Sequence, residues 1–364
     1  NLSLFSNHFD TTYNHYIERE RGEKKEEMNR GDMEEVMKEK GKVCVTGGSG
    51  YLGSWMVMRL LQLGYYVNTT IRSHPDRKKD VSYLTNLPGA QERLNIFNAD
   101  LHKPQSFNAA IEGCIGVFHV AHPIDFENKE PEETITQRTI NGAIGILQEC
   151  LSSKTVKRVV YTSSASTVVG TGSSNVIINE CSWTDVDIMR TLKPFASSYI
   201  ISKTLTEKAA LEFAEKNGID LVTVIPTWIH GTFITPQIPG SVHSSMEMIL
   251  GHQNFSMSYP PIVPFVHVDD VTNAHIFLFE NPNAKGRYIC SAVEITREKL
   301  AEFLLTRYPE FQKQITEYTW TSTKDLKGSS ISSKRLLETG FKYKYGLEEM
   351  FDGAIECCKQ RDIL

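Results

Sequence analysis

Short apolar runs rich in β-branched residues alternate with longer stretches of helical periodicity from about residue 41 onward. We predict strands at Val43–Thr46, Tyr66–Ile71, Leu94–Asn98, Val117–Ala121, Arg158–Thr162 and Leu221–Ile225. The main helices are expected at Ser54–Leu63, around Pro131–Ser152 and at Ser197–Lys216. Alternation of this kind builds a parallel sheet with helices on both faces and its ligand-binding loops along one edge. The pattern therefore predicts a Rossmann-type, doubly wound α/β fold.

The alternation breaks down after Pro226, where prolines punctuate the loops. Short helices are expected there at Arg297–Arg307 and Leu347–Lys359. We interpret residues 227–364 as the main part of a smaller C-terminal lobe that binds substrate. This lobe belongs to one Rossmann-type domain that spans residues 41–364.

Residues 1–40 have a different composition, dominated in their second half by Glu, Lys and Arg. A segment with so few apolar residues cannot bury a hydrophobic face, so we expect a disordered or upstream tail without function. The chain begins with Asn, and Met28, Met33 and Met37 are candidate start residues.

Overall composition is typical of a globular protein, with 364 residues, 40% hydrophobic and 23% charged. The net charge of −5 supplies no basic field for nucleic acid or for an anionic membrane surface. No apolar run approaches the ~18–20 residues of a membrane span. The seven cysteines are scattered, lack zinc-binding spacing and suggest a reducing compartment. We therefore expect a cytoplasmic protein with no metal and no obligatory protein partner.

A glycine-rich loop, Thr46-Gly-Gly-Ser-Gly-Tyr-Leu-Gly53, lies between the first predicted strand and the first helix. Gly47 permits a tight turn, Gly50 allows the backbone to approach a pyrophosphate, and Gly53 allows close packing of helix on strand. The helix N-terminus offers free N–H groups and a positive dipole end to the phosphates. The loop therefore predicts dinucleotide binding.

Basic residues follow the second strand at the position that selects between NAD and NADP. NAD-binding folds commonly place an acid about 20 residues after the glycine loop, where it holds the ribose 2′-hydroxyl. Arg72 stands there instead, with Arg77, Lys78 and Lys79 close behind. We therefore predict NADP(H) as the cofactor. Asp100, after the third strand, either accepts a hydrogen bond from the adenine amino group or only forms a turn.

Ser163 and Ser164 end the fifth predicted strand, and Tyr199 and Lys203 share one face of the helix that follows. Hydride addition to a carbonyl leaves negative charge on oxygen, which needs a proton from a well-placed acid. A lysine ammonium ~4–5 Å from a tyrosine stabilises the phenolate by roughly 3–4 kcal/mol at an effective dielectric near 20. We therefore expect Lys203 to lower the pKa of Tyr199, and Ser164 to orient the carbonyl.

These motifs, in this order, resemble the extended short-chain dehydrogenase/reductase family. Within it the chain is most similar to the plant dihydroflavonol 4-reductase-like group, with vestitone reductase nearest. The resemblance runs from about Gly41 to the C-terminus. The segments that carry it are Val43–Trp55, Asn98–Leu101, His119–Phe126, Ser197–Ala210, Val266–Asp270, Gly286–Ser291 and Glu348–Cys358.

The resemblance implies roles for individual residues. Ser164, Tyr199 and Lys203 would form the catalytic group, and Tyr199 and Lys203 would also contact the cofactor. The other cofactor contacts that the resemblance implies are Gly47, Gly50, Tyr51, Leu52, Gly53, Arg72, Lys79, Asp100, Leu101, Val120, Ala121, Pro226, Ile229 and Ser241. Lys78 is a possible substitute for Lys79.

Two positions depart from the group. His122 follows Val120-Ala121 where Ser or Thr is usual, and Val169 stands where dihydroflavonol 4-reductases carry a polar residue, often Asn. Val169 puts reduction of dihydroflavonols themselves in doubt, whereas His122 either changes only the hydrogen bonding near the nicotinamide or indicates another substrate. The Asn-Trp-Tyr-Cys-Tyr-Gly-Lys signature of cinnamoyl-CoA reductases is absent around Tyr199.

The resulting expectation is NADPH-dependent reduction of a small-molecule ketone, flavonoid-like or isoflavonoid-like, to an alcohol. One alternative is a nucleotide-sugar epimerase or dehydratase of the same fold, which would keep a tightly bound oxidised cofactor. Another is a non-catalytic NADP-sensing module that regulates a protein partner. The presence of Ser164, Tyr199 and Lys203 together favours the enzyme.

Overall fold

The computed structural model describes residues 40–72, 80–123, 130–171, 177–251, 260–318 and 329–364. Its centre is a seven-stranded sheet in the order β10-β7-β5-β4-β1-β2-β3, and every neighbouring pair is parallel. The strands are β1 (Lys42–Thr46), β2 (Tyr66–Ile71), β3 (Leu94–Asn98), β4 (Gly116–His119), β5 (Arg158–Thr162), β7 (Leu221–Pro226) and β10 (Gly286–Cys290). The order confirms the predicted doubly wound Rossmann-type sheet.

The strand order reverses direction at β1, which lies between β2 and β4. Thr46 at the end of β1 is in register with His119 at the end of β4. Open α/β sheets bind ligands outside the carboxyl ends of the strands at such a switch point. The fold therefore places two segments on either side of this crevice. One is the glycine loop, which follows Thr46, and the other is the segment after His119.

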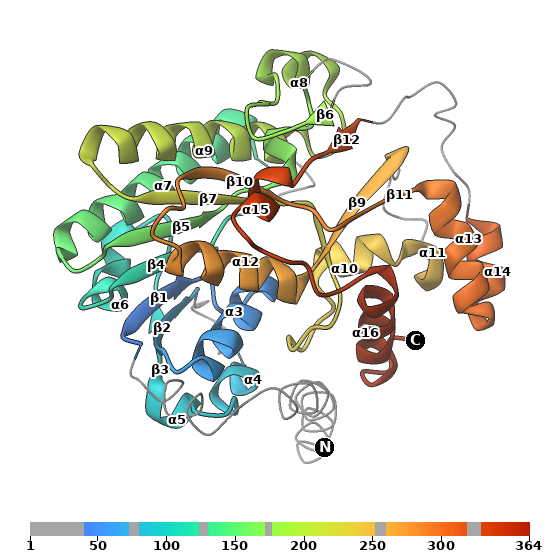
Figure 1. The fold of residues 1–364 in the computed structure, drawn as a ribbon, viewed down its shortest axis with the longest axis horizontal. Helices are drawn as coiled ribbons and strands as arrows, with labels where there is room; N and C mark the ends of the chain where they lie inside the picture. Colours follow the sequence, from blue (N-terminus) through green and yellow to red (C-terminus); the bar gives the residue numbers. More distant parts are fainter. Residues whose placement is uncertain (1–39, 73–79, 124–129, 172–176, 252–259, 319–328) are drawn as a thin grey trace.

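Helices cover both faces of the central sheet (Figure 1). On one face α3 (Tyr51–Gln62) packs against α12 (Val268–Glu280), and on the other α7 (Glu132–Ser153) packs against α9 (Ser197–Asn217). Successive residues of β1 alternate between these faces, since Val43 and Val45 join the first cluster and Cys44 the second. This period of two is the expected consequence of the pleat.

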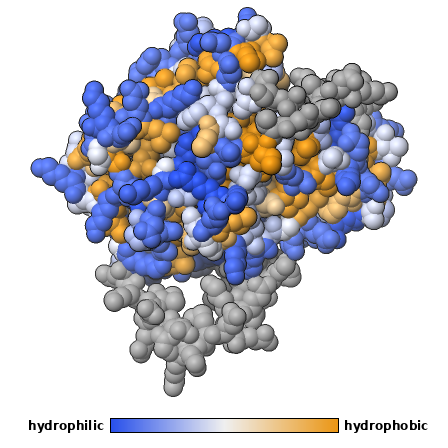
Figure 2. Space-filling view, turned by 45° about the horizontal axis from the view of Figure 1, so that its top comes forward, coloured by the Kyte–Doolittle hydropathy of each residue, from blue (hydrophilic) through white to orange (hydrophobic). Residues whose placement is uncertain are grey.

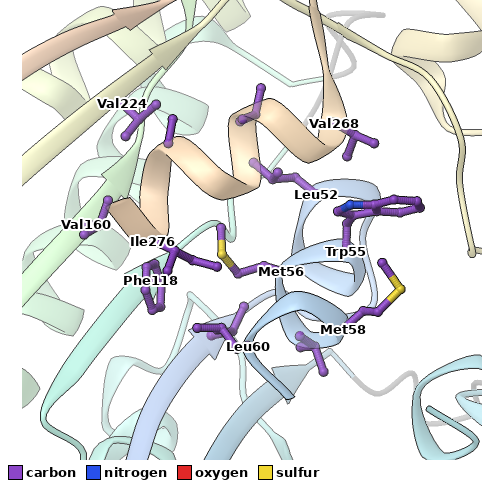
Figure 3. Close-up of a cluster of buried hydrophobic side chains, with 14 of the residues drawn as sticks. Leu52, Trp55, Met56, Met58, Leu60, Phe118, Val160, Val224, Val268 and Ile276 are labelled. Atoms are coloured by element: carbon purple, nitrogen blue, oxygen red, sulfur yellow. The ribbon is translucent and has the colours of Figure 1, made fainter. Parts of the chain in front are cut away.

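The core beneath α3 and α12 is shown in Figure 3. Trp55 and Met56 on α3 are almost completely buried, as is Val268 at the start of α12. Phe118 and Val160 reach the same cluster from the sheet. Truncation of a buried aromatic of this size typically lowers the free energy of unfolding by about 3–5 kcal/mol. This core therefore contributes strongly to the stability of α3, the helix that directly follows the glycine loop.

The C-terminal lobe has its own three-stranded sheet and its own core. Its strands are β8 (Trp228–His230), β9 (Ile262–His267) and β11 (Val293–Thr296), with β9 parallel to β8 and antiparallel to β11. Its helices are α10 (Gly240–Ser245), α11 (Glu247–Leu250), α13 (Arg297–Arg307), α14 (Gln312–Glu317) and α16 (Leu347–Lys359). The expected bounds of α13 and α16 agree with the structure.

Shorter elements complete the description. They are α4 (Ser82–Thr85), α5 (Ala90–Arg93), η1 (Pro104–Phe107), α6 (Asn108–Ile111), η2 (Ala165–Thr167), β6 (Ile177–Ile178), α8 (Val186–Leu192), η3 (Pro309–Phe311), β12 (Ser330–Ile331) and α15 (Lys334–Glu338). Strand β12 pairs with β6 and so ties the chain near its C-terminus to the segment before α8.

Two elements within residues 227–364 return to the central sheet. Strand β10 pairs with β7, with Gly286 opposite Val222, and α12 covers the face that α3 shares. The C-terminal lobe is therefore built from segments on both sides of α12 and β10. The excursion into the lobe interrupts the strand–helix alternation, which is why the sequence pattern did not indicate a seventh strand.

The surface carries scattered apolar residues, as is usual for globular proteins. Figure 2 shows hydrophobic residues in several groups separated by hydrophilic ones on one face. Ile177 and Leu192 are the most exposed large hydrophobic side chains of the described residues, at 70% and 69%. Among the described helices, none combines the length and apolar character needed to cross a bilayer.

Candidate active site

The glycine loop lies between β1 and α3, as predicted, and close contacts explain its small residues. Gly47 adopts a left-handed φ of 75°, and a Cβ on it would lie 3.0 Å from the Ala121 Cα atom. A Cβ on Gly53 would lie 2.2 Å from the Gly47 carbonyl oxygen, which real structures do not tolerate. The loop is therefore packed against Ala121, two residues after the end of β4, and against its own helix.

Gly48 is as tightly constrained as Gly53. A Cβ at this position would lie 1.9 Å from Thr69 Oγ1 on β2, and the Gly48 N–H donates to the Thr70 carbonyl at 2.9 Å. The Thr69 hydroxyl is itself fixed by donating to the Val45 carbonyl. The contact is between distant segments, so a local motif does not show it.

Helix α3 begins at Tyr51, three residues before the expected Ser54. Its N-cap is Gly50, and no side chain of the described residues caps the helix. The backbone N–H groups of Tyr51, Leu52 and Gly53 thus form the uncapped first turn, which provides donors and a positive dipole end. A glycine cradle without side chains, beside an uncapped helix start, fits a pyrophosphate.

Thr46 joins the ends of β1 and β4 through its hydroxyl. The backbone N–H groups of Val120 and Ala121 donate to Thr46 Oγ1 at 3.1 and 3.0 Å, and His119 Nδ1 lies 2.9 Å from the same oxygen. The two N–H donors occupy the acceptor capacity of the hydroxyl, so its proton is donated to His119 Nδ1. Burial lowers the pKa of His119 to about 3, which agrees with a neutral imidazole that accepts this bond.

Ser164 stands at the carboxyl end of β5, where the sequence predicted it. It is the N-cap of η2, and its Oγ accepts the Ser166 N–H at 3.2 Å. The same hydroxyl hydrogen-bonds the Tyr199 side chain on α9. The structure therefore brings together two residues that are far apart in the sequence.

Lys203 lies one helical turn beyond Tyr199 and is almost completely buried, at 4% exposure. Its Nζ donates to the Thr162 carbonyl at 3.0 Å and lies 5.4 Å from the centre of the Tyr161 ring. Burial lowers the pKa of Lys203 to about 7, and the charge of Glu207 acts in the opposite direction. The ammonium is thus held at the end of β5 beside Ser163 and Ser164.

The electrostatics of Tyr199 differ from the sequence-based expectation. Burial raises the pKa of Tyr199 above its ordinary value, and the hydrogen bond with Ser164 only partly offsets this rise. The expected lowering by Lys203 is not seen, because burial of Tyr199 is the largest effect on its pKa, and the Lys203 Nζ donates to the Thr162 carbonyl. In this state Tyr199 retains its proton.

The turn that leads into α9 contains two non-glycine residues in the left-handed region. Lys193, at the C-cap of α8, has φ 44°, and Ala196, at the N-cap of α9, has φ 58°. Left-handed backbone costs roughly 1–2 kcal/mol for a residue with a Cβ. Such strain is kept only where the surroundings fix it, and here it sets the start of the helix that carries Tyr199.

The residues expected to hold the adenosine half lie after β2 and β3. Arg72 is exposed at the end of β2, whereas Lys78 and Lys79 lie outside the described residues. Asp100 accepts the His102 backbone N–H at 3.0 Å, so its carboxylate takes part in a turn. Leu101 packs against Gly142 of α7, where a Cβ would lie 3.2 Å from the Leu101 Cβ.

The remaining expected cofactor contacts lie where the sheet meets the lobe. Pro226 ends β7 opposite Cys290, and Ile229 lies in β8 opposite Val266. Ser241 is in α10, and its carbonyl accepts a hydrogen bond from Trp228 Nε1 at 3.1 Å. These three positions belong to neighbouring elements at the carboxyl end of β7.

Together the fold and the site define a dinucleotide-binding α/β protein of the short-chain dehydrogenase type. The chain belongs to the NAD dependent epimerase/dehydratase family, whose model matches residues 43–290.

Curated relatives extend this assignment over most of the chain. The chain is 50% identical over 334 residues to vestitone reductase of Medicago sativa, an alignment that covers 89% of this chain and 99% of the relative. It is 48% identical to Protein BRI1-5 ENHANCED 1 of Arabidopsis thaliana, with 90% and 91% covered. It is 46% identical to dihydroflavonol 4-reductase of Callistephus chinensis, with 88% and 87% covered.

A solved structure agrees with the fold. The crystal structure of vestitone reductase from alfalfa, Medicago sativa, matches with a TM-score of 0.79 at 47% identity. The match covers 89% of this chain and all of the crystallised chain. The resemblance identified from the sequence motifs is thereby confirmed.

Proposed function

We propose that this chain is an NADPH-dependent reductase that converts a ketone on a flavonoid-like or isoflavonoid-like molecule to an alcohol. The observation that carries the proposal is the hydrogen bond between Ser164 and Tyr199, with Lys203 buried on the same helix. These groups stand at the carboxyl ends of the strands, on the edge that carries the glycine loop. The arrangement therefore places Tyr199, as the proton donor, at the same edge of the sheet as the loop expected to bind a dinucleotide.

The chain's own residues would perform the proton chemistry. Ser164 would donate a hydrogen bond to the substrate carbonyl oxygen and hold it near the Tyr199 hydroxyl. The raised pKa of Tyr199 suits an acid, because the residue keeps its proton until the carbonyl oxygen gains negative charge. Bound NADPH would supply the hydride.

Lys203 would act on the tyrosine and on the cofactor. Its buried ammonium would stabilise the phenolate that remains after Tyr199 has given up its proton. Its anchorage to the Thr162 carbonyl, at 3.0 Å, holds the ammonium at the end of β5. From there it could also hold the nicotinamide ribose.

The glycine loop and Arg72 would bind and select the cofactor. The first turn of α3 and the loop at Gly47–Gly50 would hold the pyrophosphate. Arg72, exposed at the end of β2, would meet the 2′-phosphate of NADP. Val120 and Ala121, fixed by Thr46, would lie against the nicotinamide half.

The substrate class rests on relatives of high identity. Vestitone reductase and dihydroflavonol 4-reductase cover almost the whole described domain at 50% and 46% identity. Both names specify a reductase. We therefore infer a polyphenolic ketone as the substrate of this chain.

The test is consumption of NADPH, and separately of NADH, with a panel of ketones: vestitone, dihydroflavonols, flavanones and aliphatic controls. Turnover of one polyphenolic ketone with NADPH strongly preferred is the expected result. Protein purified with stoichiometric bound NAD, without net turnover, would favour an epimerase or dehydratase instead. Saturable NADPH binding without turnover on any ketone would favour a sensing module.

We also infer that the protein works in a reducing compartment such as the cytoplasm. All seven cysteines are free thiols, and Cys181 alone is exposed. Free thiols are usual where glutathione and thioredoxin keep cysteines reduced.

A further inference from the structure

Glu207 lies on α9, four residues after Lys203, and no step described above uses it. Its side chain is completely buried. A buried carboxylate is costly unless it is paired and fully hydrogen-bonded. Its partners therefore indicate what the surrounding structure needs from it.

Three elements of the central sheet donate hydrogen bonds to the Glu207 carboxylate. Ser163 Oγ at the end of β5 donates to Oε2 at 2.6 Å, and Thr223 Oγ1 on β7 donates to Oε1 at 2.9 Å. Arg287 on β10 donates from Nε to Oε1 at 2.9 Å and from Nη2 to Oε2 at 3.2 Å. The carboxylate thus binds α9 to three neighbouring strands.

The Arg287 guanidinium is saturated in the same network. Besides the two bonds to Glu207, it donates to the carbonyls of Glu180 and Ser182 and to Thr167 Oγ1. These partners account for all five of its N–H donors. The Trp183 ring covers it, with the guanidinium carbon 3.5 Å from the ring centre.

The network reaches the residues proposed for the chemistry from two sides. Ser163 directly precedes Ser164, so the bond to Glu207 fixes the strand end from which the Ser164 hydroxyl extends. Residues four apart share a helix face, so the Glu207 carboxylate lies one turn from the Lys203 ammonium. The Glu207 carboxylate is therefore bonded to the end of β5 and lies on α9, the helix that carries Tyr199 and Lys203.

We propose that Glu207 is a positioning residue, which joins Ser163 to the helix of Tyr199 and places its negative charge beside the Lys203 ammonium. The inference rests on the proposed function of Ser164, Tyr199 and Lys203. It assigns to Glu207 no contact with substrate or cofactor.

Among the described titratable groups that act on the Lys203 ammonium, Glu207 is the one that carries a negative charge. His119 and His122 face it from the end of β4, and burial holds the pKa of each imidazole below its ordinary value, so both are neutral. The Tyr161 ring on β5 lies beneath the ammonium, and burial raises the pKa of Tyr161 and of Tyr199. Arg287 faces the far side of the carboxylate.

The test is the Glu207→Gln variant, which keeps the shape and removes the charge. The readout is the pKa of the Lys203 ammonium, measured by NMR on lysine-labelled protein and assigned with Lys203→Arg. Opposite charges one helical turn apart at an effective dielectric near 20 alter a pKa by about one to two units. We expect the Lys203 pKa to fall by that amount, and an unchanged value would overturn the charge role.

Asp269→Asn is the matched control. Asp269 forms a buried pair with Arg59 between α12 and α3, away from Lys203. A purely structural role predicts that both variants lose stability and that neither alters Lys203. Our proposal predicts that only Glu207→Gln shifts the Lys203 pKa.

Glu207→Asp keeps the test decisive if Glu207→Gln does not fold. The shorter side chain retains the charge but cannot span the same distance to Ser163 and Thr223. We expect kcat to fall at least about tenfold while NADPH binding stays the same, and a wild-type kcat would overturn the positioning role. Absence of ketone turnover by the wild-type protein would instead contradict the proposed function, and the NMR comparison would still decide the role of Glu207.

Discussion

The His122 ring stands edge-on to the Tyr199 ring, with the ring centres 5.6 Å apart and the planes at 86°. His122 Nε2 is buried and has no hydrogen-bond partner among the described residues. Burial, followed by the charge of Lys203, keeps the pKa of His122 well below its ordinary value, so the imidazole is neutral. A buried polar atom without a partner costs free energy that a bound ligand can recover.

We expect His122→Thr to weaken catalysis selectively on polar ketones. If the substrate supplies the partner of Nε2, its loss removes about 0.5–1.5 kcal/mol, or roughly three- to tenfold in kcat/KM. An aliphatic ketone without hydroxyl groups serves as the control, and its kcat/KM should stay the same. Equal losses on both ketones, or weaker NADPH binding, would show that the ring has another role.

Gly53→Ala should abolish tight cofactor binding. The new Cβ would lie 2.2 Å from the Gly47 carbonyl oxygen, and the backbone that should face the pyrophosphate would have to move. We expect the Kd for NADPH to rise at least about tenfold, measured by titration of the purified protein.

Gly240→Ala is the control for this substitution, because a Cβ at Gly240 meets no atom of the described residues within 4 Å. It should leave the Kd within about twofold. Comparable affinities for the Gly53 and Gly240 variants would mean that the glycine loop does not hold the cofactor.

Arg72→Ala should reduce the preference for NADPH over NADH. A charge-assisted hydrogen bond contributes about 1.5–3 kcal/mol, so kcat/KM for NADPH should fall about ten- to hundredfold. The value for NADH should change little, because NADH lacks the 2′-phosphate. Lys299→Ala, an exposed change in the lobe, controls for net charge, and a similar loss there would argue against a direct contact.

Glu247 should make the stability of the lobe dependent on pH. The side chain is almost fully buried, and its Oε1 has no hydrogen-bond partner in the part of the chain that the structure describes. Burial raises its pKa to about 7, although Tyr318 donates a hydrogen bond to Oε2. An acid with a raised pKa in the folded state favours folding when protonated, and this contribution is lost as the pH rises through about 7.

Glu247→Gln should therefore raise Tm relative to wild type at about pH 8 and leave it nearly equal at about pH 4.5. Thermal unfolding followed by circular dichroism measures both. A difference of the same size at the two pH values would mean that the carboxyl group does not titrate as its burial indicates.

Local pattern was sufficient to predict the first part of the central sheet. β2, β3 and β5 have the expected bounds, because each is a short run with β-branched and aromatic residues between turn residues. Strand β4 ends at His119, two residues before the prediction, because the Thr46 hydroxyl takes the Val120 and Ala121 N–H groups out of the sheet. Strand β10 was not predicted, because its pairing with β7 depends on residues far away in the sequence.

The candidate site shows the same difference between what a local pattern predicts and what contacts between distant segments determine. Gly47, Ser164, Tyr199 and Lys203 could be selected by order and spacing, and the structure brings Ser164 into contact with Tyr199. The direction of the Tyr199 pKa could not be predicted, because it depends on burial. The roles of Thr46, Gly48, Glu207 and Arg287 rest on contacts between segments that no local motif records.

The most direct test of the proposed function compares wild type with Tyr199→Phe. NADPH oxidation would be followed with the best ketone of the panel, and the NADPH Kd of both proteins measured beside it. Removal of the phenolic hydroxyl takes away the proposed acid and leaves the ring, so we expect an unchanged Kd and a loss of at least about a hundredfold in kcat. A variant that turns over at nearly the wild-type rate would contradict the assignment of Tyr199 as the proton donor and, with it, the proposed mechanism.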